Sequence, residues 1–208
     1  MSDTNKKLVA LTFDDGPSTL TPKVLDILEE NGVVATFFLI GNLVTEDKKA
    51  IMERQIKMGC ELANHSFTHS DMTKMTAAEI RDEIDKTTKI IKDMAGYDVK
   101  FFRPPYIALN DTMYDTISLP FIEGLGCYDW EPDRPAEERL SIVLNEVQDG
   151  TLVLLHDFED NIHTVEALPE MISGLKEKGY SFVTVSELFE QKKINPNVKH
   201  KIWTNVFC

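Results

Sequence analysis

Short apolar runs with the character of β-strands alternate with amphipathic, helix-like segments along most of this chain. The clearest strand is residues 33–40, VVATFFLI, and the longest helix is residues 76–94, whose isoleucines recur on one face. Such alternation is typical of a parallel sheet wrapped by helices. A complete (β/α)8 barrel typically needs about 250 residues. Since this chain has 208, we expect an α/β fold that forms an irregular (β/α) barrel with seven strands.

The same patterns predict where the elements lie. Strands are expected at residues 8–13, 33–40, 60–63, 100–102, within 121–127, 151–155 and 181–185. Helices are expected at residues 21–31, 46–58, 76–94, 111–116, 137–147, 164–178 and 185–191. We find no repeat or linker, so we predict a single domain over residues 1–208, with the barrel at about 7–191. Residues 192–208 show no period and are expected to pack along the surface.

Composition excludes several kinds of partner. A net charge of −13 and a pI of about 4.8 leave no basic surface for nucleic acid or for an anionic membrane. No apolar run reaches the roughly 20 residues of a membrane-spanning helix, and residues 1–7 lead into the first strand without a visible signal peptide. Cys60, Cys127 and Cys208 are far apart and odd in number, so any metal must be held by histidine and carboxylate ligands.

Two adjacent carboxylates, Asp14 and Asp15, end the first predicted strand and precede the turn dipeptide Gly16-Pro17. Loops at the carboxyl ends of parallel strands converge on ligand sites. Two neighbouring acids repel each other unless a cation or a proton lies between them, so one could bind a metal while the other acts as a base. The alternative is that both are N-terminal acids of the helix that follows.

A pair of histidines, His65 and His69, follows the third predicted strand. Their i, i+4 spacing would place both imidazoles on one face of a helical turn, as two ligands of one metal require. Together with Asp15 they would form a set of two histidines and one carboxylate, which leaves positions open for water and substrate. The alternative is a pair of ordinary surface histidines.

A third histidine, His156, ends the predicted strand at residues 151–155. A histidine in this position suits a general acid if a carboxylate orients it and keeps it protonated, and Asp129 and Asp157 are both candidates. Alternatively, His156 is a strand-end residue that hydrogen-bonds to the backbone. His163 and His200 have no comparable context, and we expect them to be solvent residues.

Arg103 precedes two prolines and Tyr106, a sequence that forms neither a helix nor a central strand. A guanidinium on such a rigid turn suits the fixing of a carboxylate, and Asp14 is the candidate. An exposed arginine on a surface turn is the equally plain alternative.

Taken in order, five short motifs between Thr12 and His156 form a pattern: TFDDGP, HSFTH, RPPY, DW and LLH. In this order they resemble the five motifs of the polysaccharide deacetylase family, also known as the NodB-homology or carbohydrate esterase family 4 group. The alternation of strands and helices is similar to the irregular barrel of that family up to about residue 191.

The resemblance implies one divalent metal ion, zinc or cobalt, bound by Asp15, His65 and His69. It implies that the backbone N–H of Tyr106 stabilises the oxyanion together with the metal. The side chains of Tyr106 and Trp130 would line the groove that binds a polysaccharide.

The same resemblance implies two acid–base pairs. Asp14 would be the general base, braced by Arg103. His156 would be the general acid, tuned by Asp129.

Two positions depart from the family pattern. Gly126 stands three residues before Asp129, where many members have a further Asp, and Ile107 stands where many have Gly. Residues 101–132 and 195–199 resemble acetylxylan esterase modules of clostridial xylanases more than peptidoglycan deacetylases. Without the acid at position 126 we expect weaker support of His156, which ester hydrolysis would tolerate better than amide hydrolysis.

We therefore expect a metal-dependent hydrolase that removes acetyl groups from a polysaccharide, and O-acetyl groups of acetylxylan before others. The substrate class implies an extracellular or secreted protein, as one module of a larger polypeptide. The alternatives are an N-deacetylase of chitin or peptidoglycan N-acetylglucosamine and an inactive carbohydrate-binding relative. A magnesium-dependent phosphohydrolase with an aspartate nucleophile is disfavoured, because its two acids are separated by one residue.

Overall fold

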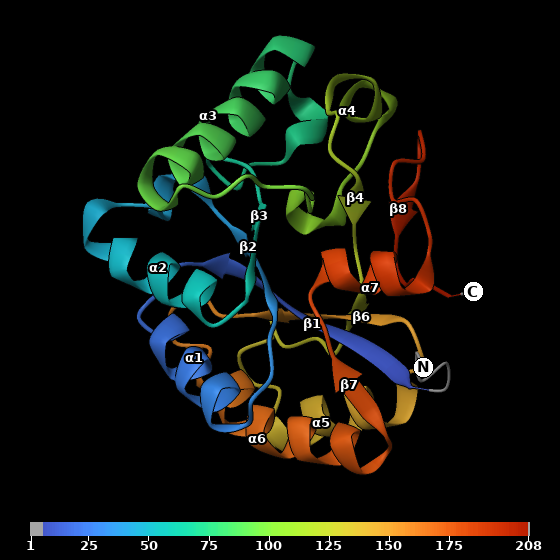
Figure 1. The fold of residues 1–208 in the computed structure, drawn as a ribbon. Helices are drawn as coiled ribbons and strands as arrows, with labels where there is room; N and C mark the ends of the chain where they lie inside the picture. Colours follow the sequence, from blue (N-terminus) through green and yellow to red (C-terminus); the bar gives the residue numbers. More distant parts are fainter. Residues whose placement is uncertain (1–5, 208) are drawn as a thin grey trace.

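Strand β1 (Lys7–Gly16) lies at the centre of a parallel sheet in the computed structural model, which describes residues 6–207 (Figure 1). Strand β6 (Thr151–His156) pairs with most of its length. Strand β7 (Tyr180–Phe182) pairs with its first residues, and β2 (Thr36–Leu39) pairs with its last. The predictions for residues 1–5 and for Cys208 lie outside the described residues.

The sheet continues through β3 (Glu61–Asn64) beyond β2 and through β5 (Leu125–Gly126) beyond β6. A second, two-stranded sheet pairs β4 (Phe121–Ile122) with β8 (Ile202–Trp203). Phe102 connects the two sheets through isolated bridges to Asn64 and Phe121. A further bridge joins Thr151 of β6 to Asn205, just after β8, so the strands form an irregular ring that single bridges close.

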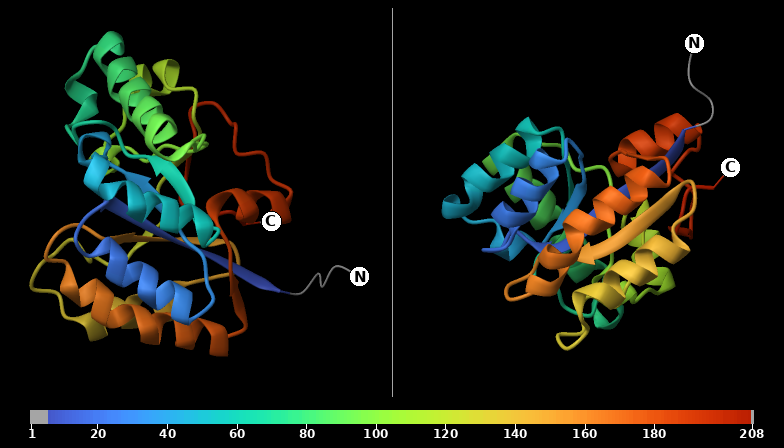
Figure 2. Two further views of the ribbon diagram at one scale, coloured as in Figure 1. Left: turned by 60° about the vertical axis from the view of Figure 1, so that its left-hand side comes forward. Right: turned by 90° about the horizontal axis from the view of Figure 1, so that it is seen from below.

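Most of the helices cover the outside of the ring (Figure 2). Helices α1 (Thr21–Glu30), α5 (Ala136–Glu146) and α6 (Ile162–Glu177) pack together, and α2 (Lys49–Lys57) and α3 (Ala77–Ala95) pack beside β3. The short helix α4 (Asp111–Thr116) contacts α3, and α7 (Val185–Lys192) contacts β1. None of the helices in the described part of the chain is long and apolar enough to cross a membrane.

The two faces of β1 belong to different hydrophobic clusters, because side chains alternate along a strand. Val9, Leu11 and Phe13 pack in the main core with α1 and α6. Leu8 and Ala10 face the inside of the ring, where residues of α7 cover them. Since α7 occupies the end of the ring at which β1 begins, the opposite end, where β1 finishes, is left for the site.

The predicted α/β fold with a parallel sheet wrapped by helices is confirmed, but the strands differ in detail. Residues 100–102 contribute only the bridges of Phe102, because the following prolines cannot donate to a ladder. The predicted strand within 121–127 divides at Gly124, whose φ of 131° and close approach to β6 break the ladder. The predicted surface tail also contributes β8 and buries Trp203 and Val206. The described residues therefore hold eight strands.

Candidate active site

Asp14 and Asp15 leave the end of β1 in different directions. Asp14 lies on the same face as Ala10, inside the ring, and it is paired in register with His156 of β6. The pairing of β1 with β2 shifts between Asp14 and Gly16, and at this shift Asp15 has a left-handed φ of 70°. The carboxylate of Asp15 consequently lies beside the histidines that follow β3.

Asp15, His65 and His69, which we call the metal-binding set, bring three possible ligand atoms together. Oδ1 of Asp15 lies 3.4 Å from Nε2 of His65 and 3.3 Å from Nε2 of His69. Two ligands that each lie about 2.1 Å from a tetrahedral zinc ion are roughly 3.4 Å apart. Within residues 6–207, this is the one group of His, Cys, Asp and Glu whose ligand atoms converge in this way.

The chemistry of these side chains fits a divalent cation. Nδ1 of His65 donates to the backbone oxygen of Arg103 at 2.7 Å, which leaves Nε2 as a lone-pair donor. Burial lowers the pKa of His69 and so favours its neutral ring. Burial raises the pKa of Asp15, but His65, His156 and His69 outweigh it and lower that pKa to about 2. Oδ1 of Asp15 is buried and has no hydrogen-bond donor among the described residues, which a bound cation would remedy.

The loop that carries the two histidines is not the helical turn suggested by their spacing. Ser66 and His69 have φ values of 63° and 57°, and the two imidazole centroids are 4.9 Å apart. The buried carboxylate of Glu83, from α3, accepts hydrogen bonds from the backbone N–H groups of Phe67 and Thr68, each at 2.8 Å. The predicted proximity is therefore present, but an anchored loop produces it.

Arg103 is fully buried rather than exposed. Its Nη1 donates to Oδ1 of Asp14 at 2.5 Å, and its Nη2 donates to the backbone oxygen of Glu123. Its guanidinium also lies over the ring of Phe38, with Cζ 4.1 Å from the centroid. The other oxygen of Asp14 is 3.6 Å from Nε2 of His65, so that Arg103 orients the carboxylate of Asp14 beside the metal-binding set.

His156 and Asp129 form the second pair. Nδ1 of His156 donates to Oδ1 of Asp129 at 2.8 Å, and the backbone N–H of His156 donates to Oδ2 at 2.7 Å. Burial alone lowers the pKa of His156, but the charge and hydrogen bond of Asp129, with the charges of Asp14 and Asp15, raise it to about 9. A protonated imidazole therefore faces the site at neutral pH.

Asp157, the other candidate partner of His156, points elsewhere. Its Oδ2 accepts from Oγ1 of Thr21 at 2.5 Å, and burial raises its pKa to about 7. Of the two candidates, Asp129 is therefore the one whose carboxylate contacts the ring of His156.

Other residues contact Asp129 in this chain, where Gly126 provides no acid. Asp129 accepts a further hydrogen bond from Oγ1 of Thr164 at 2.9 Å, in addition to those from His156. A Cβ atom at position 126 would lie 3.1 Å from the ring of Trp130. The glycine therefore makes room for the indole.

Tyr106 and Trp130 stand at the rim of the site. Their side chains are 69% and 46% exposed, and their rings lie 4.7 Å from that of His69 and 5.9 Å from that of His156, respectively. Tyr106 and Ile107 have left-handed φ values of 58° and 53°. Between these side chains lies a cavity of about 400 Å³, lined by Asp14, Asp15, His65, His69, Pro104, Tyr106, Ile107, Trp130, Leu154 and His156.

A second cleft, of about 460 Å³, also includes residues of the metal-binding set. Asp15 and His69 line both spaces. Leu43, Lys48 and Phe158 contribute to the second cleft, and the ring of Phe158 also lies 5.9 Å from that of His156. The two spaces therefore meet at residues of the metal-binding set.

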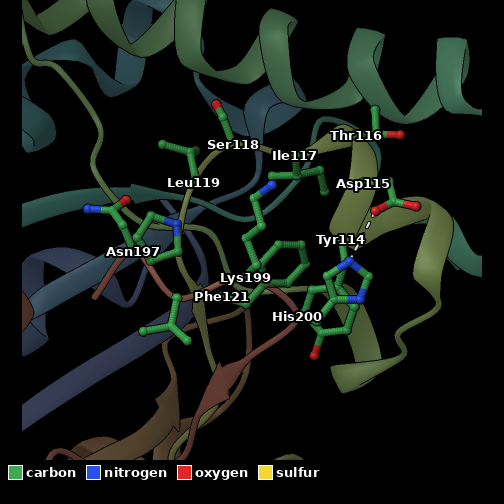
Figure 3. A pocket seen from close by; sticks show the side chains of 12 residues that line it. Tyr114, Asp115, Thr116, Ile117, Ser118, Leu119, Phe121, Asn197, Lys199 and His200 are labelled. Carbon is green, nitrogen blue, oxygen red and sulfur yellow. Dashed lines mark hydrogen bonds and ion pairs between the residues drawn. The ribbon is translucent and has the colours of Figure 1, made fainter. Parts of the chain in front are cut away.

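A further cavity, of about 410 Å³, lies between α4 and the tail and includes none of these site residues (Figure 3). His200 stacks on Tyr114 there, and its Nε2 is 3.0 Å from Oδ1 of Asp115.

The other histidine outside the site, His163, pairs with Glu166 at 2.8 Å. Both histidines have side chains that are at least two-fifths exposed, as expected for solvent residues.

The sequence did not identify the residues that support the site through hydrogen bonds. Glu83 and Thr164 are two of them. Glu83 lies on the face of α3 that carries Ile80, Ile84 and Thr87, and an acid within an apolar stripe was a signal that could have identified it. Thr164 is one of many threonines, and its sequence context gives no such signal.

Comparison with known proteins identifies the class. The family model described as polysaccharide deacetylase matches residues 1–119, which is more than half of the chain. The chain therefore belongs to the polysaccharide deacetylase family, and it is a carbohydrate esterase family 4 domain.

Individual relatives refine this assignment. The bifunctional xylanase/deacetylase of Pseudobutyrivibrio xylanivorans is 60% identical over 202 residues, which cover 97% of this chain and 34% of that protein. The chain thus spans about a third of the length of this relative.

Two solved structures are similar over nearly their whole length. The Xyl-CE4 domain of a multidomain xylanase from the hindgut metagenome of Trinervitermes trinervoides is 57% identical, with a TM-score of 0.96 and coverage of 97% of this chain and 98% of that one. A family 4 acetyl xylan esterase from Clostridium thermocellum, in complex with a cobalt ion, is 44% identical, with a TM-score of 0.93 and coverage of 96% and 99%.

Proposed function

We propose that this domain hydrolyses O-acetyl esters of xylan with one divalent metal ion, zinc or cobalt. The observation that carries the proposal is that the metal-binding set, the carboxylate of Asp14 and the imidazole of His156 line a single cavity. The names of the similar xylanase modules and of the acetyl xylan esterase support xylan as the polymer, and the cobalt ion of the latter supports the metal.

Asp15, His65 and His69 would hold the metal, which when bound would polarise the acetyl carbonyl and acidify water. Asp14 takes the proton of the attacking water, because its free oxygen lies beside the set and Arg103 fixes its other oxygen. The general base is thus oriented before the substrate arrives.

His156 gives its proton to the departing sugar oxygen, since Asp129 orients its ring and keeps it protonated. The backbone N–H of Tyr106 donates to the oxyanion. A single such donor typically contributes about 3–4 kcal/mol to the stabilisation of the transition state.

The polysaccharide lies across both clefts, with the reacting sugar at the metal-binding set. Tyr106 and Trp130 contact it on one side, and Leu43 and Phe158 contact it on the other. Exposed aromatic and aliphatic side chains suit the apolar faces of sugar rings, and the acidic chain does not oppose a largely neutral polymer. The chain would work as a single domain of residues 1–208, one module of a larger extracellular polypeptide.

The decisive experiment compares acetate release from acetylxylan and from an N-acetylglucosamine oligomer, with zinc, cobalt or magnesium supplied in turn. We expect faster release from acetylxylan, with zinc or cobalt. Faster release from the N-acetylated oligomer would instead identify an N-deacetylase. No acetate release with any metal would identify an inactive relative, and phosphatase activity with magnesium would identify a phosphohydrolase.

A further inference from the structure

A buried arginine lies behind the pair of His156 and Asp129. Arg139 belongs to α5, and only 1% of its surface is exposed. Its Nη1 donates to Oδ1 of Asn161 at 2.5 Å and to Oγ1 of Thr164 at 2.7 Å. A buried guanidinium carries a large desolvation cost, so its partners must be fixed in place for the charge to remain there.

The donor and acceptor roles in this cluster are fully determined by Arg139, because a guanidinium has donors and no acceptor. The hydroxyl oxygen of Thr164 accepts from Arg139, so its single proton is free to donate to Oδ2 of Asp129, 2.9 Å away. The amide oxygen of Asn161 likewise faces Arg139, so its Nδ2 faces the other way and donates to the backbone oxygen of His156 at 2.9 Å.

We propose that Arg139 is a positioning residue for the proton donor of the reaction, acting through Thr164 and Asn161 on Asp129 and His156. Its charge keeps the hydroxyl of Thr164 and the amide of Asn161 aligned toward the catalytic pair. Arg139 itself does not line the cavity, and its hydrogen bonds go to residues outside the cavity lining. This inference rests on the proposed role of His156 as general acid.

Arg139 also has a structural role that the test must separate. Its Nε donates to the backbone oxygen of Arg134 at 2.9 Å, and its Nη2 donates to that of Glu131 at 3.0 Å. These bonds hold the loop between Asp129 and α5. Loss of loop order would lower the amount of active protein and would reduce every activity by the same factor.

Proton donation provides the discriminating readout. A sugar alkoxide departs only with help from an acid, whereas 4-nitrophenolate departs without a proton. We therefore compare kcat/KM for acetylxylan with kcat/KM for 4-nitrophenyl acetate, using the metal-loaded enzyme and the variants Arg139→Met, Arg139→Lys and Thr164→Val. The matched control is Arg134→Met, because Arg134 pairs with Glu131 and Glu138 on the surface of the same region.

In Arg139→Met, we expect kcat/KM for acetylxylan to fall by about tenfold to a hundredfold, below the full contribution of a general acid. The loss on 4-nitrophenyl acetate should be at least about tenfold smaller, because that leaving group needs no proton. Arg139→Lys should recover part of the loss, since it restores the buried cation. Arg134→Met should leave the ratio of the two activities as in the wild type.

Thr164→Val keeps the volume and removes the hydroxyl, so it tests the same connection without removing the charge. The double variant Arg139→Met/Thr164→Val should lose little more than the more damaging single variant, because both act on Asp129.

Equal losses on the two substrates, or additive losses in the double variant, would overturn the inference. A wild type that releases acetate from 4-nitrophenyl acetate but from no polysaccharide would instead refute the proposed function. A protein that fails to fold with methionine at position 139 leaves Thr164→Val to decide by the same ratio.

Discussion

At the scale of single residues, Asp14 and Asp15 have the same chemistry but different surroundings. Asp14 is held by the guanidinium of Arg103, and Asp15 lies between two imidazoles. We expect Asp14→Asn to lower kcat by about a hundredfold to ten-thousandfold, because it removes the general base. Its metal content should stay close to that of the wild type.

Asp15→Asn and His69→Ala should instead lose metal affinity by more than about tenfold, together with activity. The measurement is bound metal per chain after dialysis against a metal buffer, beside kcat for the same samples. Loss of metal in Asp14→Asn with retention in Asp15→Asn would reverse the two roles.

The raised pKa of His156 predicts how the activity depends on pH. Burial lowers the pKa of His156, but Asp129, Asp14 and Asp15 raise it overall from 6.5 to about 9. Activity that needs the protonated ring should therefore persist through neutral pH and decline as the pH rises through about 9. A profile of kcat/KM for acetylxylan that already declines near pH 6.5 would contradict this prediction.

Protonated His156 also contributes to the free energy of unfolding, and this contribution too is lost at alkaline pH. Because the folded pKa lies above the unfolded value, the stabilising contribution of protonated His156 is fully present below about pH 6.5 and is lost as the pH rises through about 9. Asp129→Asn should remove this alkaline loss, which denaturant titrations at neutral and alkaline pH would detect.

At the scale of elements, α2 carries an unexpected polar residue. Gln55 is fully buried, and neither end of its amide has a hydrogen-bond partner within residues 6–207. An unsatisfied buried polar group costs about 1–3 kcal/mol. We therefore expect Gln55→Met, which keeps the shape, to raise the free energy of unfolding by about 1 kcal/mol and Tm by about 2–4 °C.

The matched control is Gln191→Met, at an exposed position of α7, which should change Tm little. A scanning calorimetry experiment on both variants would test the prediction. A lower Tm for Gln55→Met would show that the amide is satisfied in solution, as a buried water would allow.

Elements with a strong apolar period were predicted well from the sequence, and irregular segments were not. Helix α3 occupies residues Ala77–Ala95, close to the predicted range 76–94, because Thr76 caps it and its isoleucines recur on one face. The loop after β3 was not predicted, since the left-handed residues Ser66 and His69 have no sequence signature.

The site residues likewise divide into those that the sequence identified and those that it did not. His65, His69 and His156 were recognisable because histidines are few and follow strands directly. Arg139 and Thr164 were not, because their contact depends on how α5 and α6 pack, which no local pattern records.

At the scale of the whole molecule, the two clefts predict how a polymer is bound. Leu43 is 39% exposed and lines the second cleft, away from the proposed acid and base. One buried methylene contributes about 0.8 kcal/mol, so Leu43→Ala should raise KM for acetylated xylo-oligosaccharides by about twofold to fivefold with kcat little changed. KM for 4-nitrophenyl acetate should not change.

Val198→Ala is the control, because Val198 is similarly exposed but lines the cavity between α4 and the tail. Steady-state kinetics with oligosaccharides of increasing length would show the effect. An equal rise in KM for the small ester would mean that the second cleft does not bind sugar.

The central place of β1 also governs how the protein is made. This strand precedes the other described strands in the chain, yet its partners in register extend to His156 and Phe182. Contacts so distant in sequence are slow to form, because a long loop must close before they stabilise anything. A nascent chain that ends before β6 therefore lacks the strand that pairs with most of β1. It also lacks His156, which lies opposite Asp14. Assembly of the site must await nearly the whole domain, and a stalled chain would expose the apolar edge of β1 to chaperones or aggregation.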